Sequence, residues 1–151
     1  MQMKNKTLIP IFAMLLILTS LEILSAQTNV EISDITINGN SINSNPVIML
    51  KDSENLAIAV KFRAIETLED TRVKIFISNK KDSVFASSDR FNVFEGMNYI
   101  QRLIINQPNK LKYKLQTYNL TVRISSKGEA PVEKNYLIEM SKIKSKSNSK
   151  I

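Results

Sequence analysis

The fold class is decided by the stretch Leu56-Ala57-Ile58-Ala59-Val60-Lys61-Phe62-Arg63-Ala64, in which large apolar side chains recur at every second position. Leu56, Ile58, Val60 and Phe62 share one parity, whereas Lys61 and Arg63 share the other. Successive side chains of a β-strand point to opposite faces, so this alternation predicts a strand with one buried face.

The same period of two recurs on both sides of this stretch. It is clear at 73–77, 118–124 and 132–140, and shorter apolar runs at 47–50, 84–86 and 91–94 read as brief strands. Segment 30–37 changes phase at Ser33-Asp34, which indicates a β-bulge or a strand that switches sheets. Segment 99–105 carries apolar residues on both parities, which predicts a strand buried on two sides.

Turn residues separate these segments. Asn38-Gly39 is a tight-turn signal because both residues tolerate positive φ, and Pro46 makes the run that follows an edge strand at best. The acidic run 66–70 and the polar run 79–82 read as connections, and the glycines at 96 and 128 mark further turns. Strands at this spacing predict an all-β sandwich of about seven to eight antiparallel strands.

These segments resemble an immunoglobulin-like β-sandwich module of secreted archaeal and bacterial surface proteins. Segment 30–37 with its Asn-Gly turn is similar to the first strand of such modules, and 56–62 with 72–77 is similar to their central pair. Segment 118–122 resembles the penultimate strand, where a Tyr often makes a corner. The chain departs from the antibody type because it has no Trp and no Cys. The resemblance implies an architecture and an extracellular setting, and the family functions of scaffolding, adhesion and assembly.

The first 26 residues have the layout of a secretory signal. Lys4 and Lys6 precede the apolar run 8–21, and Ser25-Ala26 offers small residues for cleavage. The run is shorter than the roughly 20 residues of a membrane span, although Glu22 at the membrane surface would allow an uncleaved anchor, a membrane tether through residues 4–24. We therefore divide the chain into a signal peptide or retained apolar helix (1–26), an immunoglobulin-like domain (27–141) and a basic disordered tail (142–151).

The positive charge is concentrated near the C-terminus. The chain has 21 Lys and Arg against 14 Asp and Glu, and four lysines fall in the last ten residues: Lys142, Lys144, Lys146 and Lys150. A segment rich in Lys and Ser cannot bury enough apolar surface to fold alone. Such a tail either contacts an anionic surface or serves as a solubilising end.

The chain contains no Cys and no His. Nucleophilic pairs that use either residue are therefore excluded, and ordinary zinc sites lose their preferred ligands. Glu66, Glu69 and Asp70 would supply oxygen ligands for calcium, and Asp82, Asp89 and Glu95 would supply carboxylates for glycoside chemistry, but ordinary solvated loops explain both sets better. We predict a non-enzymatic protein with no catalytic, cofactor-binding or metal site.

Two surface features remain as candidate sites. Asn119-Leu120-Thr121 is an N-glycosylation sequon, and strand parity places Asn119 away from the face of Leu120. Parity also places Phe76 and Phe85 outward, although burial of the aromatic residues, including Tyr99, Tyr113 and Tyr118, is the simpler expectation.

These observations predict a secreted or cell-surface, non-catalytic module for envelope interaction, adhesion or assembly. Its partner is an unspecified protein or glycan of the cell envelope, with no specific nucleic acid. The alternative is a pilin-like filament or envelope-layer subunit that retains its N-terminal apolar helix, although the chain lacks the Gly expected before the apolar run. Retention of residues 8–24 in the mature protein would favour that alternative.

Overall fold

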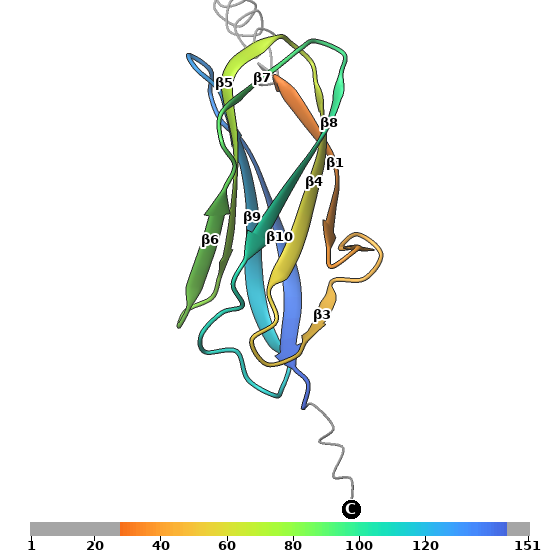
Figure 1. Ribbon diagram of the computed structural model, residues 1–151, viewed down its shortest axis with the longest axis vertical. Helices are drawn as coiled ribbons and strands as arrows, with labels where there is room; N and C mark the ends of the chain where they lie inside the picture. The colour runs from red at the N-terminus through yellow and green to blue at the C-terminus, as the bar shows by residue number, and fades with distance from the viewer. Residues whose placement is uncertain (1–27, 145–151) are drawn as a thin grey trace, which may run out of the picture.

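The computed structural model describes residues 28–144, which form two β-sheets packed face to face (Figure 1). The ten strands are β1 (Val30–Ile37), β2 (Asn40–Ser41), β3 (Val47–Leu50), β4 (Leu56–Ala64), β5 (Leu68–Ser78), β6 (Ser83–Ser87), β7 (Phe91–Val93), β8 (Asn98–Ile105), β9 (Gln116–Ser125) and β10 (Val132–Lys142). No part of 28–144 is a helix able to span a bilayer. The all-β sandwich prediction is confirmed, whereas the expected N-terminal apolar helix lies outside the described residues.

The two sheets differ in size. The smaller has the order β2-β1-β4-β8, and the larger has the order β3-β10-β9-β5-β6, with β7 also pairing with β5. The prediction of about seven to eight strands was too low. β7 lies within the predicted brief strand at 91–94, but β2 has only two residues and shows no readable period. The prediction that all strands are antiparallel was also wrong. β3 pairs in parallel with β10 after the chain has crossed from one sheet to the other.

The core lies between the alternating faces of these sheets. β4 contributes Leu56, Ile58, Val60 and Phe62 from the smaller sheet, and β5 and β9 contribute their apolar faces from the larger one. Phe62 packs on Tyr99 of β8, with ring centroids 5.5 Å apart. Each fully buried aliphatic or aromatic side chain contributes about 1.5–3 kcal/mol, so burial stabilises this disulfide-free domain.

Two local predictions are confirmed at β1. The pairing of β1 with β4 shifts register between Ile32 and Asp34, which places a bulge at the predicted change of phase. Asn38 and Gly39 have φ of 50° and 85° and form the tight turn into β2. The Asn38 Oδ1 accepts the Ala57 N–H at 2.8 Å, so the turn is also tied to β4.

Two other predictions were wrong. β8 is not buried on both sides: it is an edge strand of the smaller sheet, and Ile100 and Ile104 are 49% and 62% exposed on its outer face. The acidic run 66–70 is not only a connection, because β5 begins at Leu68. Asp70 there has a positive φ of 50°, at the irregularity where β5 pairs with β7.

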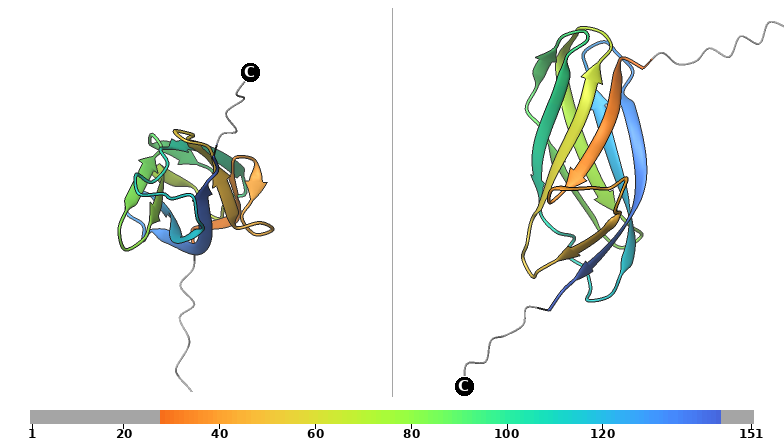
Figure 2. Two further views of the ribbon diagram at one scale, coloured as in Figure 1. Left: turned by 90° about the horizontal axis from the view of Figure 1, so that it is seen from below. Right: turned by 90° about the vertical axis from the view of Figure 1, so that its right-hand side faces the viewer.

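The sandwich is elongated along its strands, and the two ends of the described chain lie at opposite ends of it (Figures 1 and 2). β1 begins at the upper end in Figure 1, and β10 finishes at the lower end. The longest strands have 11 residues, which corresponds to about 36 Å at 3.3 Å per residue. The connecting loops therefore form two well-separated surfaces.

Candidate functional site

Four segments meet at the lower end of the sandwich in Figure 1: residues 51–55, 79–82, 106–115 and 142–144. We call this surface the lysine end. It carries three carboxylates, on Asp52, Glu54 and Asp82. It also carries eight lysines, a formal excess of five positive charges: Lys51, Lys80, Lys81, Lys110, Lys112, Lys114, Lys142 and Lys144.

Hydrogen bonds join these segments around the β8–β9 loop. The Gln107 Nε2 donates to the carbonyl oxygens of Lys51 and Glu54, both at 3.1 Å. The Lys110 N–H donates to Asp82 Oδ2 at 2.6 Å, and the Lys142 N–H donates to the carbonyl oxygen of Lys112 at 2.8 Å. The lysine end is therefore one continuous surface built from residues up to 93 positions apart.

The three carboxylates are engaged within this surface. Asp52 accepts the Tyr113 hydroxyl at 2.7 Å and lies 3.5 Å from the Lys142 Nζ. Glu54 accepts the Lys51 N–H at 2.7 Å, and Asp82 accepts two backbone N–H groups. Among the described residues, the other seven lysines of the lysine end form no ion pair with a carboxylate. Their charges remain available to an external anion.

The Tyr113–Asp52 contact has an electrostatic signature. The hydrogen bond that the Tyr113 hydroxyl donates to Asp52 is the largest cause that raises the pKa of Tyr113 above its usual value of 10.0. Desolvation and the charge of Asp52 make smaller contributions in the same direction. The ring of Tyr113 is exposed, and the Lys144 Nζ lies 5.9 Å from its centroid. Tyr113 therefore links a carboxylate to the exposed cationic surface.

The opposite end of the sandwich has the reverse charge. Residues 65–70, 88–97 and 126–131 carry two cations, Arg90 and Lys127. They carry six carboxylates: Glu66, Glu69, Asp70, Asp89, Glu95 and Glu129. Across 28–144, no three Asp or Glu side chains gather as a metal-binding group, and Asp70 lies 3.8 Å from the Arg90 Nη1. Asp82 lies at the lysine end, so the carboxylate set of Asp82, Asp89 and Glu95 is not brought together.

The sequence anticipated only part of the lysine end. Lys142 is the last residue of β10, so the boundary of the expected tail at 142 falls inside a strand. Lys144 lies beside Tyr113, and Lys146 and Lys150 lie outside the described residues. The lysines at 51, 80, 81, 110, 112 and 114 were missed because they are dispersed in the sequence. The run Lys110-Leu111-Lys112-Tyr113-Lys114-Leu115 was the local signal.

The sequon Asn119-Leu120-Thr121 lies on β9, a central strand of the larger sheet. Asn119 is exposed on the outer face, between Ser78 of β5 and Leu137 of β10. The Thr121 hydroxyl donates to Asn135 Oδ1 at 2.6 Å. Side-chain accessibility is compatible with modification of Asn119, which stays a prediction.

The aromatic residues do not share one groove. Phe76 and Phe85 stack on the outer face of the larger sheet, where parity placed them, with ring centroids 6.1 Å apart. The expectation that the aromatic residues are buried was wrong for Phe85 and Tyr113, which are 69% and 53% exposed. Phe85 lies on the solvent face of the edge strand β6, and Tyr113 lies in the β8–β9 loop.

Tyr118 is buried, and this burial is the main cause that raises its pKa, with Asp82 adding to the rise and Asn79 opposing it. The buried Tyr118 hydroxyl has no hydrogen-bond partner among the described residues. Within residues 28–144, Tyr118 therefore lacks the hydroxyl hydrogen bond of an immunoglobulin-type tyrosine corner.

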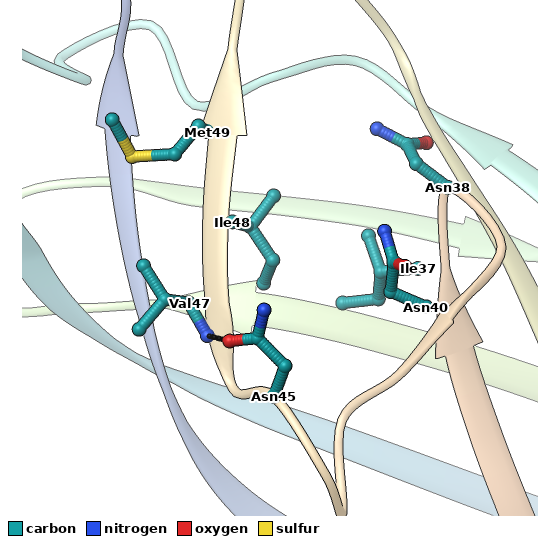
Figure 3. A pocket seen from close by; sticks show the side chains of 7 residues that line it. All are labelled: Ile37, Asn38, Asn40, Asn45, Val47, Ile48 and Met49. Atoms are coloured by element: carbon teal, nitrogen blue, oxygen red, sulfur yellow. Dashed lines mark hydrogen bonds between the residues drawn. The ribbon is translucent and has the colours of Figure 1, made fainter.

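Figure 3 shows a cavity of about 230 Å³ between β3 and the β1–β2 turn. Three asparagines line it, on residues 38, 40 and 45, above a floor that includes Ile37 and Ile48. Asn38 Oδ1 accepts the Ala57 N–H, and Asn45 Oδ1 accepts the Val47 N–H at 3.1 Å. Two of the three amides therefore brace backbone turns, and no charged side chain lines this cavity. We assign these asparagines a structural role at the sheet edges and no role in ligand binding.

Comparison with known proteins supports the fold. No protein-family model matches the chain, and no curated protein matches it. Among solved structures, the C-terminal domain of Wzt is similar, with a TM-score of 0.54 over 79% of this chain and 76% of that chain. The sequence identity is 16%, so the likeness concerns the fold alone. It supports an immunoglobulin-like β-sandwich.

Proposed function

We propose that this protein is a non-catalytic, secreted or cell-surface β-sandwich module that binds an anionic component of the cell envelope through its lysine end. The observation that carries the proposal is that the acidic and basic groups of this surface differ in their partners. Its carboxylates are engaged internally, whereas seven of its eight lysines have no ion-pair partner in the described part of the chain. The extracytoplasmic setting is supported by the layout of residues 1–26.

The physical basis is a local field of one sign at one end of an elongated molecule. Clustered cations attract an anionic partner and orient the molecule, since the acidic end is repelled by the same partner. Interactions between exposed charges weaken as salt shortens the screening length from about 10 Å at 0.1 M to about 3 Å at 1 M. Binding should therefore be strong at low ionic strength and fall steeply with added salt.

Co-sedimentation of the full-length protein with isolated envelopes of the source cell tests this function. The test variant combines Lys110→Glu, Lys112→Glu and Lys114→Glu, whose side chains make no ion pair or hydrogen bond within residues 28–144. We expect the bound fraction to fall by at least tenfold, since each basic residue near an anionic surface contributes about 1 kcal/mol.

A matched control changes the same amount of charge elsewhere. It combines Arg63→Glu, Arg102→Glu and Lys127→Glu, which are exposed and lie outside the lysine end. Equal loss of binding in both triple variants would show a response to net charge alone and would overturn the assignment of the site. Salt-insensitive binding that survives the test variant would overturn the proposed function.

A further inference from the structure

A polar cavity of about 370 Å³ opens within the lysine end, between the β3–β4 and β8–β9 loops. Its polar lining is formed by Ser53, Asn55, Asn106, Gln107, Asn109 and Lys142. The side chains of Asn55, Asn106 and Asn109 make no hydrogen bond to other described residues. Three amide groups, each with donors and an acceptor, are therefore free for a ligand.

Gln107 fixes one wall of this cavity. Its Nε2 donates to the carbonyl oxygens of Lys51 and Glu54, so the orientation of the amide is fixed by two acceptors. Its Oε1 is buried and has no donor among the described residues. A buried acceptor without a partner is energetically unfavourable. Gln107 therefore holds the β8–β9 loop against the β3–β4 loop and gives the cavity one fixed wall, whereas its buried Oε1 is not accessible from the cavity.

Building on the function proposed above, we infer that this cavity binds a sugar residue of an anionic polysaccharide, with the surrounding lysines pairing with its acidic groups. Sugar hydroxyls donate and accept at once, which matches the paired capacities of the three free asparagine amides. The volume is within the range of small-ligand sites, about 300–1,000 Å³. The exposed ring of Tyr113 lies nearby on the same loop and offers a face for an adjacent sugar.

The composition of the surface favours an acidic glycan over other polyanions. A bilayer is flat and would leave the amide-lined cavity unused, because lipid attraction needs only charge and exposed apolar groups. Single-stranded nucleic acid is usually held by several aromatic side chains that stack on bases. The lysine end exposes one aromatic ring, on Tyr113, and its cations are all lysines rather than the arginines that bind phosphate bidentately.

The test compares two anions of similar charge, one a sugar and one not. The sugar probes are tetrasaccharides of galacturonate, glucuronate and mannuronate and a sulfated dextran oligomer, and the other anion is poly-glutamate. We expect at least one acidic oligosaccharide to shift the side-chain amide NMR signals of Asn106 and Asn109 in the full-length protein. The variant Asn106→Ala with Asn109→Ala should bind that oligosaccharide about tenfold more weakly, as expected for two lost hydrogen bonds.

Three comparisons separate the possible failures. The control pair Asn40→Ala and Asn43→Ala changes two exposed asparagines in and just after β2, outside the cavity. This pair should leave oligosaccharide binding unchanged, and the cavity variant should leave poly-glutamate binding unchanged. If no oligosaccharide shifts the amide signals, or if the cavity variant binds both anions as the wild type does, the sugar site is refuted and only charge attraction remains. If neither anion nor the isolated envelope binds at low salt, the proposed function itself fails.

Discussion

Removal of the Asp52 charge should strengthen binding while it lowers the pKa of Tyr113. Asp52 lies 3.5 Å from the Lys142 Nζ and accepts the Tyr113 hydroxyl at 2.7 Å. Asp52→Asn keeps the shape of the side chain but releases Lys142 and adds one positive charge to the lysine end. One more lysine available to an anionic surface is worth about 1 kcal/mol, which corresponds to about fivefold tighter binding to isolated envelopes.

The second effect of Asp52→Asn is on the phenol of Tyr113, whose pKa should fall. Because Asp52 is the main cause of the raised pKa of Tyr113, its neutralisation should bring that pKa down toward 10.0. Tyrosinate absorbance near 295 nm follows this titration, and Tyr113→Phe identifies the Tyr113 component. The ion pair is partly exposed, so the loss of stability should stay below about 1 kcal/mol. Weaker envelope binding by Asp52→Asn, with the fold intact, would refute the internal role assigned to this carboxylate.

Three further predictions concern the fold, the β1–β2 turn and processing. Leu120→Ala in the core should cost about 2–5 kcal/mol in urea unfolding, whereas Leu137→Ala, on the exposed face of β10, should change stability by less than about 0.5 kcal/mol; equal effects would contradict the assigned core. Ser41→Ala should raise the pKa of Asp34 toward its usual 3.8, because the 2.7 Å hydrogen bond from Ser41 is the main cause of its lowering. Since the folded-state pKa of Asp34 is lowered, this contact stabilises the fold above pH 3.8, and that stability is lost as the pH falls through the folded pKa. The variant should therefore lose less stability than the wild type between pH 6 and pH 2. A carboxyl NMR titration of the variant identical to that of the wild type would exclude the contact. The intact mass of the native protein should correspond to a chain that begins at Gln27. A mass that includes residues 8–24 would instead favour the retained apolar helix and the filament subunit.

The strands were predictable where one face is buried and the other is solvated. At 56–64 and 118–124 the period of two follows directly from that arrangement, and Asn38-Gly39 fixed the turn because positive φ is required there. At β8 the same reasoning failed, because Ile100 and Ile104 are exposed and supply apolar residues on both parities without double burial. An edge position depends on which strands pair, and that information is not local.

The lysine end shows why most of the site was not predictable. Lys142 and Lys144 were visible as a C-terminal cluster, but Lys51, Lys80 and Lys110 belong to loops that only the order of strands brings together. The engagement of Asp52 and Asp82 was equally hidden, since their partners lie at Lys142 and Lys110. The distribution of charge along the sequence therefore indicated the basic C-terminal segment. It did not indicate that one end of the sandwich is basic and the other acidic.

Hydrogen–deuterium exchange of the full-length protein, with and without isolated envelope at low salt, would show which surface is covered on binding. We expect slower exchange in 51–55, 79–82 and 106–115, lost again at 1 M salt, with 65–70, 88–97 and 126–131 unchanged. Protection of the acidic end, or of the outer face around Phe76 and Phe85 with the lysine end unaffected, would contradict binding through the lysine end.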